Sequence, residues 1–370
     1  MNIVVAMSGG VDSSVAAALL KEAGHRVIGV TLKLLRKETG FGCCGSSRDI
    51  EDARAVCASL DVPHYVLDFA DPFQKNILDP FVDAYLAGET PNPCIACNRF
   101  VKFDALLKKA VVLGADAVAT GHYARIDVRE EKGRTVRSLR RALDLNKDQS
   151  YVLHHLGQAE LERLCFPIGG MTKPEVRDAA ARFHLKTAAK EESMEICFVP
   201  DADTAGFVKS RAGETDRSAL TLQPGPIHTL DGRRVGEHRG VAYYTRGQRN
   251  GLGLSLGKPA YVVDLDPATN ILYVGEDADT ASDRVEVRDV LWSAGTAPRE
   301  PVRAAVQIRS RHGAAAALVT PTGGGAVVLF EEPQRAVTPG QSAVFYEEDR
   351  VIGGGAVHRA VPVGRREALG

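Results

Sequence analysis

Residues 1–14, MNIVVAMSGGVDSS, decide the fold of this chain. The apolar run from Ile3 to Met7 suits a buried strand of a parallel sheet, and the apolar spacing from Val11 to Leu20 is helical. Gly9 and Gly10 lie between the two patterns and permit a tight turn. We therefore expect a strand, a glycine turn and the first turn of a helix.

Such a turn favours an anion, because backbone N–H groups and the positive end of the helix dipole point at one spot. Ser8, Ser13 and Ser14 add hydroxyl donors. The turn lacks the lysine of the Walker loop, G-x-x-x-x-G-K-[ST]. SGGVDS at 8–13 instead resembles the pyrophosphate loop of the ATP pyrophosphatases, which split ATP into AMP and pyrophosphate while they adenylate a substrate. The alternative is an ordinary strand–turn–helix whose small residues serve packing.

Composition indicates a globular protein of two or three domains. The 370 residues are 44% apolar and 25% charged, which is ordinary for soluble proteins. No apolar run approaches the ~18 residues of a membrane span, and no secretory signal is visible, so we expect a cytoplasmic protein. With 46 Lys plus Arg against 47 Asp plus Glu, the net charge of -1 does not itself indicate nucleic-acid binding.

The first 210 residues alternate between strand and helix patterns, which predicts a doubly wound parallel α/β sheet with ligands beyond the carboxyl ends of its strands. Strands are expected at 26–34, 64–69 and 115–123, and helices at 49–60, 72–86, 99–112 and 173–185. Short strands with turn signals follow and predict a small mainly-β central domain at 211–282. Alternating strands predict a C-terminal β-barrel at 283–370.

Two segments of the α/β domain have less regular patterns. Residues 88–98, GETPNPCIACN, hold two prolines, so we expect a rigid loop that carries Cys94 and Cys97. Residues 125–147 hold eight basic residues and are typical of a solvated hairpin. The KDQSY segment at 147–151 mixes charged, amide and aromatic groups, which could position a phosphate backbone and a base.

Seven cysteines, an odd count, suggest chemistry or metal binding rather than a disulfide framework. Cys94, Cys97 and Cys197 are too few for a closed zinc site. They suffice for an iron–sulfur cluster with one open iron, or for a nucleophile and a persulfide carrier. Cys57 and Cys165 are expected in the core. Cys43 and Cys44 lie in a glycine-rich loop as structural or incidental residues.

Taken together, the chain from residue 3 to about 357 resembles the tRNA-specific 2-thiouridylases. These enzymes replace the 2-oxygen of the wobble uridine, U34, with sulfur. The resemblance rests on six motifs in order: SGGVDS at 8–13, TPNPxxxCN at 90–98, ATGHYA at 119–124, KDQSY at 147–151, ICF at 196–198 and TPGQSA at 338–343.

The resemblance implies the site residues. The ATP-binding residues would be Ala6, Met7, Ser8, Gly9, Gly10, Val11, Asp12, Ser13, Leu32 and Gly121. The target base would meet Asn92, Pro93 and Cys94, and other tRNA contacts would be His122, Lys147, Asp148, Gln149, Arg309, Ser310 and Gln341. Cys97 would be the nucleophile and Cys197 the persulfide-bearing cysteine.

The resemblance also implies a mechanism with ATP and Mg²⁺ as cofactors. The uridine 2-oxygen would attack the α-phosphate of ATP and release pyrophosphate, and sulfur from a Cys197 persulfide would then attack C2. Cys97 would release that sulfur and leave a Cys97–Cys197 disulfide for an outside reductant. The expected partners are tRNA and a sulfur-donor protein, either a cysteine desulfurase or a sulfur relay protein.

The chain departs from the family pattern at Cys94, where an acid is common. The triad of Cys94, Cys97 and Cys197 resembles the [4Fe–4S] site of another class of tRNA thiolases, and it favours the cluster narrowly over the persulfide route. Two other functions fit parts of the sequence. One is an ATP pyrophosphatase that makes GMP, argininosuccinate or lysidine, and the other is a non-catalytic iron–sulfur protein that binds nucleotide and RNA.

Overall fold

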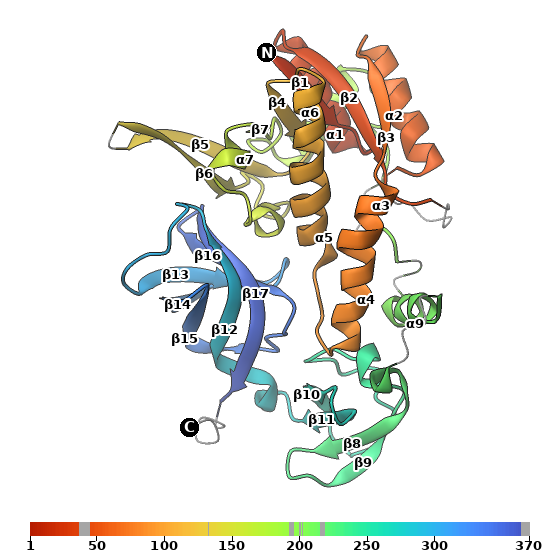
Figure 1. Cartoon of the computed structure of the whole chain (residues 1–370), viewed down its shortest axis with the longest axis vertical. Helices are drawn as coiled ribbons and strands as arrows, with labels where there is room; N and C mark the ends of the chain where they lie inside the picture. The colour runs from red at the N-terminus through yellow and green to blue at the C-terminus, as the bar shows by residue number, and fades with distance from the viewer. Residues whose placement is uncertain are drawn as a thin grey trace.

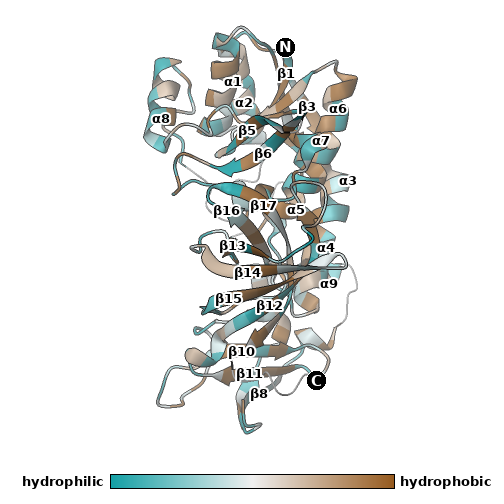
Figure 2. Cartoon of the chain, turned by 90° about the vertical axis from the view of Figure 1, so that its left-hand side faces the viewer, coloured by the Kyte–Doolittle hydropathy of each residue, from teal (hydrophilic) through white to brown (hydrophobic). Residues whose placement is uncertain are grey.

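The computed structural model describes residues 1–36, 45–131, 133–191, 196–199, 201, 203–214 and 219–363. Three units follow one another along the long axis: a parallel sheet with its helices, a β-barrel and a smaller sheet (Figure 2). No helix within the described ranges is long and apolar enough to cross a membrane.

The first unit is a parallel sheet in the order β3-β2-β1-β4-β7. Its strands are β1 (Asn2–Ala6), β2 (Arg26–Lys33), β3 (His64–Asp68), β4 (Ala117–Thr120) and β7 (Leu164–Cys165). The central strand β1 alternates between two cores, because Ile3 and Val5 belong to one hydrophobic cluster and Val4 to the other. Helices therefore cover both faces, and the expected doubly wound sheet is confirmed.

The helices of the first unit divide between these faces. On the Val5 face, α1 and α8 pack against each other. The helical elements are α1 (Val11–Glu22), α2 (Ser47–Ser59), α3 (Ala70–Phe73), η1 (Gln74–Leu78), α4 (Asp79–Leu86), α5 (Pro93–Ala96), η2 (Cys97–Ala105), α6 (Leu106–Val112), η3 (Ser150–Leu153), α7 (Gln158–Leu161), α8 (Lys173–Arg182) and α9 (Thr204–Glu214). On the Val4 face, α4, η2 and α6 contribute side chains to one core.

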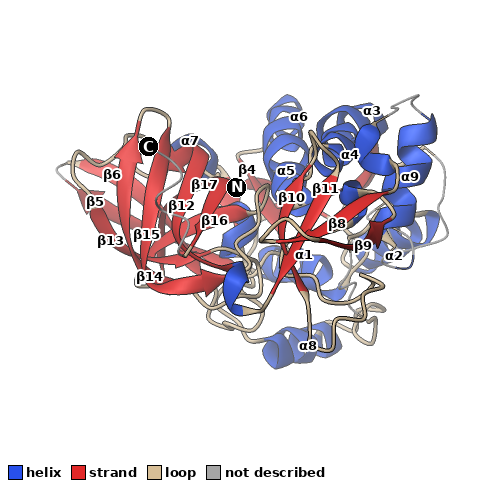
Figure 3. Ribbon diagram, turned by 90° about the horizontal axis from the view of Figure 1, so that it is seen from below, coloured by secondary structure: helices blue, strands red, loops and turns tan. Residues whose placement is uncertain are grey.

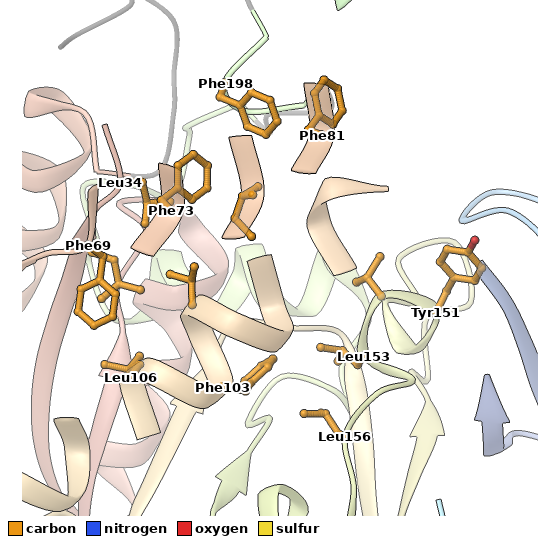
Figure 4. Packing of buried hydrophobic residues seen from close by; sticks show 14 of the residues in the cluster. Leu34, Phe69, Phe73, Phe81, Phe103, Leu106, Tyr151, Leu153, Leu156 and Phe198 are labelled. Atoms are coloured by element: carbon orange, nitrogen blue, oxygen red, sulfur yellow. The ribbon is translucent and has the colours of Figure 1, made fainter. Parts of the chain in front are cut away.

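Aromatic packing extends this second core toward residues 196–199. The ring of Phe198 meets those of Phe73 and Phe81 edge to face, with centroids 5.7 and 5.2 Å apart (Figure 4). Phe198 is only 3% exposed. Its burial therefore anchors the segment that carries Cys197.

The structure corrects the loop expected at 88–98. Helix begins at Pro93 with α5 and continues through η2, a π-helix, into α6, so Cys94 and Cys97 lie on helix. Proline is tolerated at the first helical position, because an N–H at that position has no intrahelical acceptor and its absence costs no hydrogen bond. The Asn92 side chain caps this helix and accepts a hydrogen bond from the Cys94 N–H at 3.1 Å. The expected loop is therefore correct only for residues 88–92, and it is wrong for residues 93–98.

The other two units are built of strands. Six strands close the barrel, since β12 pairs with both β15 and β17 (Figure 1). They are β12 (Ala281–Trp292), β13 (Val302–Gln307), β14 (Ala315–Thr322), β15 (Gly325–Arg335), β16 (Ser342–Glu347) and β17 (Arg350–Pro362). The smaller sheet has the order β10-β11-β8-β9, from β8 (Gly225–Thr229), β9 (Arg234–His238), β10 (Tyr261–Asp266) and β11 (Ile271–Gly275). The expected barrel and central β-domain are confirmed, whereas the boundaries at 210 and 282 stay predictions.

The basic hairpin joins the first unit to the barrel. Strands β5 (Ala124–Glu131) and β6 (Arg134–Arg141) form the expected hairpin, and β6 pairs with β17. Arg140 forms ion pairs with Asp127 of the hairpin and Asp349 of the barrel. Part of the basic run is therefore neutralised within the protein. Figure 3 shows the barrel strands on one side of the helices.

Tyr151 fastens the barrel to the first unit. Its hydroxyl donates to the Ser342 carbonyl at 2.8 Å and accepts from the Ser342 N–H at 3.2 Å. Its ring is only 1% exposed. Nearby, the Arg141 guanidinium lies 3.7 Å from the Tyr346 ring centroid. The Tyr151 ring thus serves packing between units and is not available to stack on an RNA base.

Replacing this tyrosine should weaken the docking of the barrel. Tyr151→Phe leaves the buried polar groups of Ser342 without their partner, so we expect a loss of about 1–3 kcal/mol in the free energy of unfolding. Urea denaturation of full-length protein, followed by circular dichroism, measures the change. Tyr65→Phe is the control, because Tyr65 is 49% exposed. Equal stability of the two variants would contradict the proposed role of the Tyr151 hydroxyl.

Candidate nucleotide and thiol site

The expected ATP-binding residues meet at one edge of the parallel sheet. Ala6 ends β1, and Met7 and Ser8 lead from it into the glycine turn, while α1 begins at Val11. Leu32 lies near the end of the neighbouring β2, and Gly121 follows β4. Because parallel strands end at the same edge, the sheet itself assembles this set.

Two glycines are required where elements approach closely. Gly9 has a φ of 73°, and a Cβ there would lie 2.5 Å from the Asp49 carbonyl oxygen. A Cβ on Gly121 would lie 2.6 Å from the Ser13 nitrogen. The glycine turn thus packs closely against α2, and the start of α1 packs closely against the residue that follows β4.

Hydroxyl groups hold the shape of the turn. Ser13 Oγ accepts from the Ser8 N–H at 3.1 Å and donates to the Gly10 carbonyl at 3.2 Å. Ser14 Oγ donates to the same carbonyl at 2.8 Å. Gly10 caps α1 without a side-chain hydrogen bond. The first-turn N–H groups of α1 are therefore suited to an anionic ligand.

Lys173 supplies a cation that sequence reasoning missed. Its Nζ donates to Asp12 Oδ1 at 2.7 Å, and the Tyr123 hydroxyl donates to the same oxygen at 2.9 Å. Lys173 is 8% exposed. It is the first residue of α8, which Thr172 and Glu175 cap reciprocally. That capping pattern is visible in the sequence and predicts a helix start, but it does not predict contact with the glycine turn.

Lys190 is a second cation at the turn. Its Nζ donates to the Gly9 carbonyl at 3.0 Å and to Asp49 Oδ1 at 2.9 Å, and it also pairs with Asp52. Burial lowers the pKa of Lys190, but the hydrogen bonds of Asp52 and Asp49 outweigh burial and raise that pKa. Lys190 is therefore charged at neutral pH. A turn without its own lysine receives two lysines from distant parts of the chain.

The three expected cysteines differ in exposure. Cys94 is exposed, whereas Cys97 and Cys197 are half-buried and pack against the hydrophobic cluster that holds Phe198. The Cys94 thiol lies within electrostatic reach of Cys197 and of the Lys102 ammonium. Cys94 and Cys197 are thus close enough to interact electrostatically.

Lys102 connects the cysteines with the nucleotide edge. Burial lowers the pKa of His122 well below its usual value, and the charge of Lys102 is the second cause. His122 directly follows Gly121, and the same lysine acts on Cys94. Lys102 is therefore within electrostatic reach of both the cysteine helix and the residue that follows Gly121.

The described residues do not fit the expected iron–sulfur cluster. Within them, no three His, Cys, Asp or Glu side chains are grouped so that they could hold a metal ion. Cys94, Cys97 and Cys197 are therefore not arranged as a ligand set. Cys43 and Cys44 lie outside the described residues.

Most expected tRNA contacts have partners within the protein. Asp148 accepts from Arg141 at 2.9 Å and from the Ser150 hydroxyl at 2.8 Å, and Gln149 accepts from the Tyr123 N–H at 2.9 Å. The Lys147 N–H donates to the Asp144 carbonyl at 3.0 Å, Arg309 donates to the Ala336 carbonyl, and His122 is a buried, neutral imidazole bonded to Thr120. Ser310 is exposed on the barrel. Their roles in tRNA binding stay predictions.

The barrel holds the segment that leads to Asn92 and Pro93. The Gln341 side chain donates to the Thr90 carbonyl at 2.7 Å, and the Thr90 N–H donates to the Pro339 carbonyl at 2.9 Å. Gln341, an expected tRNA contact, is therefore engaged with the chain that precedes the cysteine helix.

Comparisons with known proteins cover almost the whole chain. Residues 1–201 match a family described as the tRNA methyl transferase HUP domain, residues 217–276 its PRC-barrel domain, and residues 282–357 the aminomethyltransferase beta-barrel domain. The tRNA-specific 2-thiouridylase MnmA of Moorella thermoacetica is 50% identical over 369 residues, 97% of this chain and 100% of that protein. The proteins of the same name from Chloroflexus aurantiacus and Heliobacterium modesticaldum are 50% and 47% identical, and the matches cover 97% and 96% of this chain and 98% and 92% of those proteins. The chain belongs to the tRNA-specific 2-thiouridylase family.

Proposed function

We propose that this protein is a tRNA-uridine 2-sulfurtransferase that thiolates the wobble uridine in an ATP-dependent reaction. The observation that carries the proposal is that one lysine, Lys102, acts on both Cys94 of the cysteine helix and His122, which lies beside the glycine turn at the end of β4. Family membership supports tRNA as the substrate. The GMP, argininosuccinate and lysidine synthetases need no such cysteines, and a non-catalytic nucleotide-binding protein would release no AMP and pyrophosphate in the presence of tRNA.

The first step is adenylation of the uridine 2-oxygen, which is otherwise a poor leaving group. That oxygen attacks the α-phosphate of ATP, the bond to the β-phosphate oxygen breaks, and pyrophosphate departs. Lys173 and Lys190 offset the negative charge at the turn, where the N-terminus of α1 binds phosphate. Asp12 is the carboxylate placed to help hold Mg²⁺, which when bound neutralises phosphate charge.

The second step transfers sulfur from a Cys197 persulfide to C2 of the uridine, with AMP as the leaving group. Attack of the Cys97 thiolate on Cys197 Sγ breaks the persulfide bond, releases sulfur to C2 and forms a Cys97–Cys197 disulfide. The absence of a three-ligand group among the described residues supports this route over a cluster. A cysteine desulfurase or a sulfur relay protein recharges Cys197, and a dithiol reduces the disulfide.

The three units divide this work. Residues 1–210 carry the chemistry, residues 211–282 bind tRNA and link the other units, and residues 283–370 form the barrel that positions the cysteine helix. The substrate and the sulfur donor place the reaction in the cytoplasm.

The direct test is formation of 2-thiouridine in unmodified tRNA. Iron-free enzyme with ATP, Mg²⁺ and a persulfide donor should make the product, and Cys97→Ser and Cys197→Ser should abolish it, because each removes a sulfur that the reaction needs. Mass spectrometry of digested tRNA measures the product. Cys57→Ser is the control, since Cys57 is buried on the other face of the sheet. Product only after anaerobic cluster reconstitution would contradict the persulfide route, and product from both cysteine variants would contradict the roles of Cys97 and Cys197. Absence of 2-thiouridine from wild type under both conditions would contradict the proposed function.

Lys173 should matter for adenylation itself. Lys173→Gln removes a cation from the phosphate turn, so we expect the rate of tRNA-dependent pyrophosphate release to fall about 10²–10³-fold. Lys173→Arg keeps the charge and should recover part of the rate. Lys21→Gln is the control, because Lys21 pairs at the surface with Asp61 at 3.6 Å. A rate within about twofold of wild type for Lys173→Gln would show that Lys173 has no part in the step.

A further inference from the structure

The three site cysteines differ in their access to solvent. Cys94 is exposed, whereas Cys97 and Cys197 are half-buried. The neighbour of Cys197, Phe198, points into the aromatic core (Figure 4), so the segment is held against the protein interior. A disulfide between the two half-buried cysteines would therefore be poorly accessible to a reductant from solution.

We propose that Cys94 is the resolving thiol that carries this disulfide to the surface. The step rests on the proposed function, because it acts on the Cys97–Cys197 disulfide that sulfur transfer leaves behind.

Helix geometry brings Cys94 and Cys97 within bonding reach. Both lie on the continuous helix that begins at Pro93, and the backbone angles of Ala96 and Cys97 are α-helical. Residues three apart in an α-helix have Cα atoms about 5 Å apart. That separation lies within the range of disulfides, about 4.4–6.8 Å. The two thiols also project from nearly the same face of the helix.

Cys197 completes the relay from the other side. It packs against the same hydrophobic cluster as Cys97, and it interacts electrostatically with Cys94. The proposed function already requires Cys97 and Cys197 to reach each other, so the exchange needs only pairwise approaches and does not require all three sulfurs to surround one point, as a metal site would.

The exchange balances in atoms and electrons. The Cys94 thiol loses its proton to solvent, and the thiolate attacks Cys97 Sγ. The Cys97–Cys197 bond breaks, a Cys94–Cys97 bond forms, and Cys197 leaves as a thiolate that can accept the next persulfide sulfur. An external dithiol then attacks the exposed Cys94 Sγ, reduces the new disulfide and is itself oxidised to a disulfide.

The test separates the first turnover from later ones. Iron-free wild type and Cys94→Ser are charged with a persulfide donor and mixed with ATP, Mg²⁺ and unmodified tRNA, with thioredoxin as the only reductant. Rapid quenching measures the first 2-thiouridine per enzyme, and longer incubation measures the steady-state rate. Differential alkylation followed by mass spectrometry identifies the disulfides. Cys165→Ser is the control, because Cys165 packs against the opposite core of the sheet.

In Cys94→Ser, the ratio of the steady-state rate to the first-turnover rate should fall by about tenfold or more relative to wild type, and the Cys97–Cys197 disulfide should accumulate. A small, penetrating reductant should restore the rate, which a merely structural role would not allow. An unchanged ratio of these two rates, or complete loss of the first turnover, would overturn the proposal for Cys94. Absence of product from wild type would instead refute the proposed function.

Discussion

The hydrogen bonds that meet on one carboxylate oxygen of Asp12 are the constraint on which the nucleotide edge depends. Asp12 belongs to the first turn of α1, Tyr123 follows β4, and Lys173 starts α8. One half-buried carboxylate oxygen thus connects a helix, a strand end and a second helix from three distant parts of the chain. Loss of either donor would remove one hydrogen bond to a charged, half-buried group, which is worth more than an ordinary hydrogen bond.

Local rules were sufficient to predict the parts of the fold that local sequence determines. The apolar run of β1, the helical spacing of α1 and the turn between them follow from residues 1–14 alone. The helix start at Pro93 was missed, because two prolines close together suggest a loop unless Asn92 is recognised as a cap and Pro93 as a first helical residue. The cysteines consequently lie on a more rigid element than the sequence suggested.

The lysines at the glycine turn could not be predicted for a different reason. Lys190 reaches Gly9 across 181 positions of sequence, and nothing near Lys190 resembles a phosphate-binding motif. Only the order of strands in the sheet brings these residues together. The same holds for Tyr151, whose surroundings in sequence suggested an RNA contact while its hydroxyl in fact bonds to Ser342 of the barrel.

The docking of the barrel affects the position of the active-site cysteines, although the barrel is far from them in sequence. Glu89 forms an ion pair with Arg288 at 2.8 Å. The Thr90 N–H donates to the Pro339 carbonyl, and the Thr90 carbonyl accepts from the Gln341 side chain. Each contact contributes only about 1 kcal/mol to stability. Together they fix the backbone just before Asn92, where the cysteine helix starts. A displacement of the barrel would therefore move Cys94 and Cys97 relative to the nucleotide edge, so the chemistry of the first unit depends on how the last unit is docked.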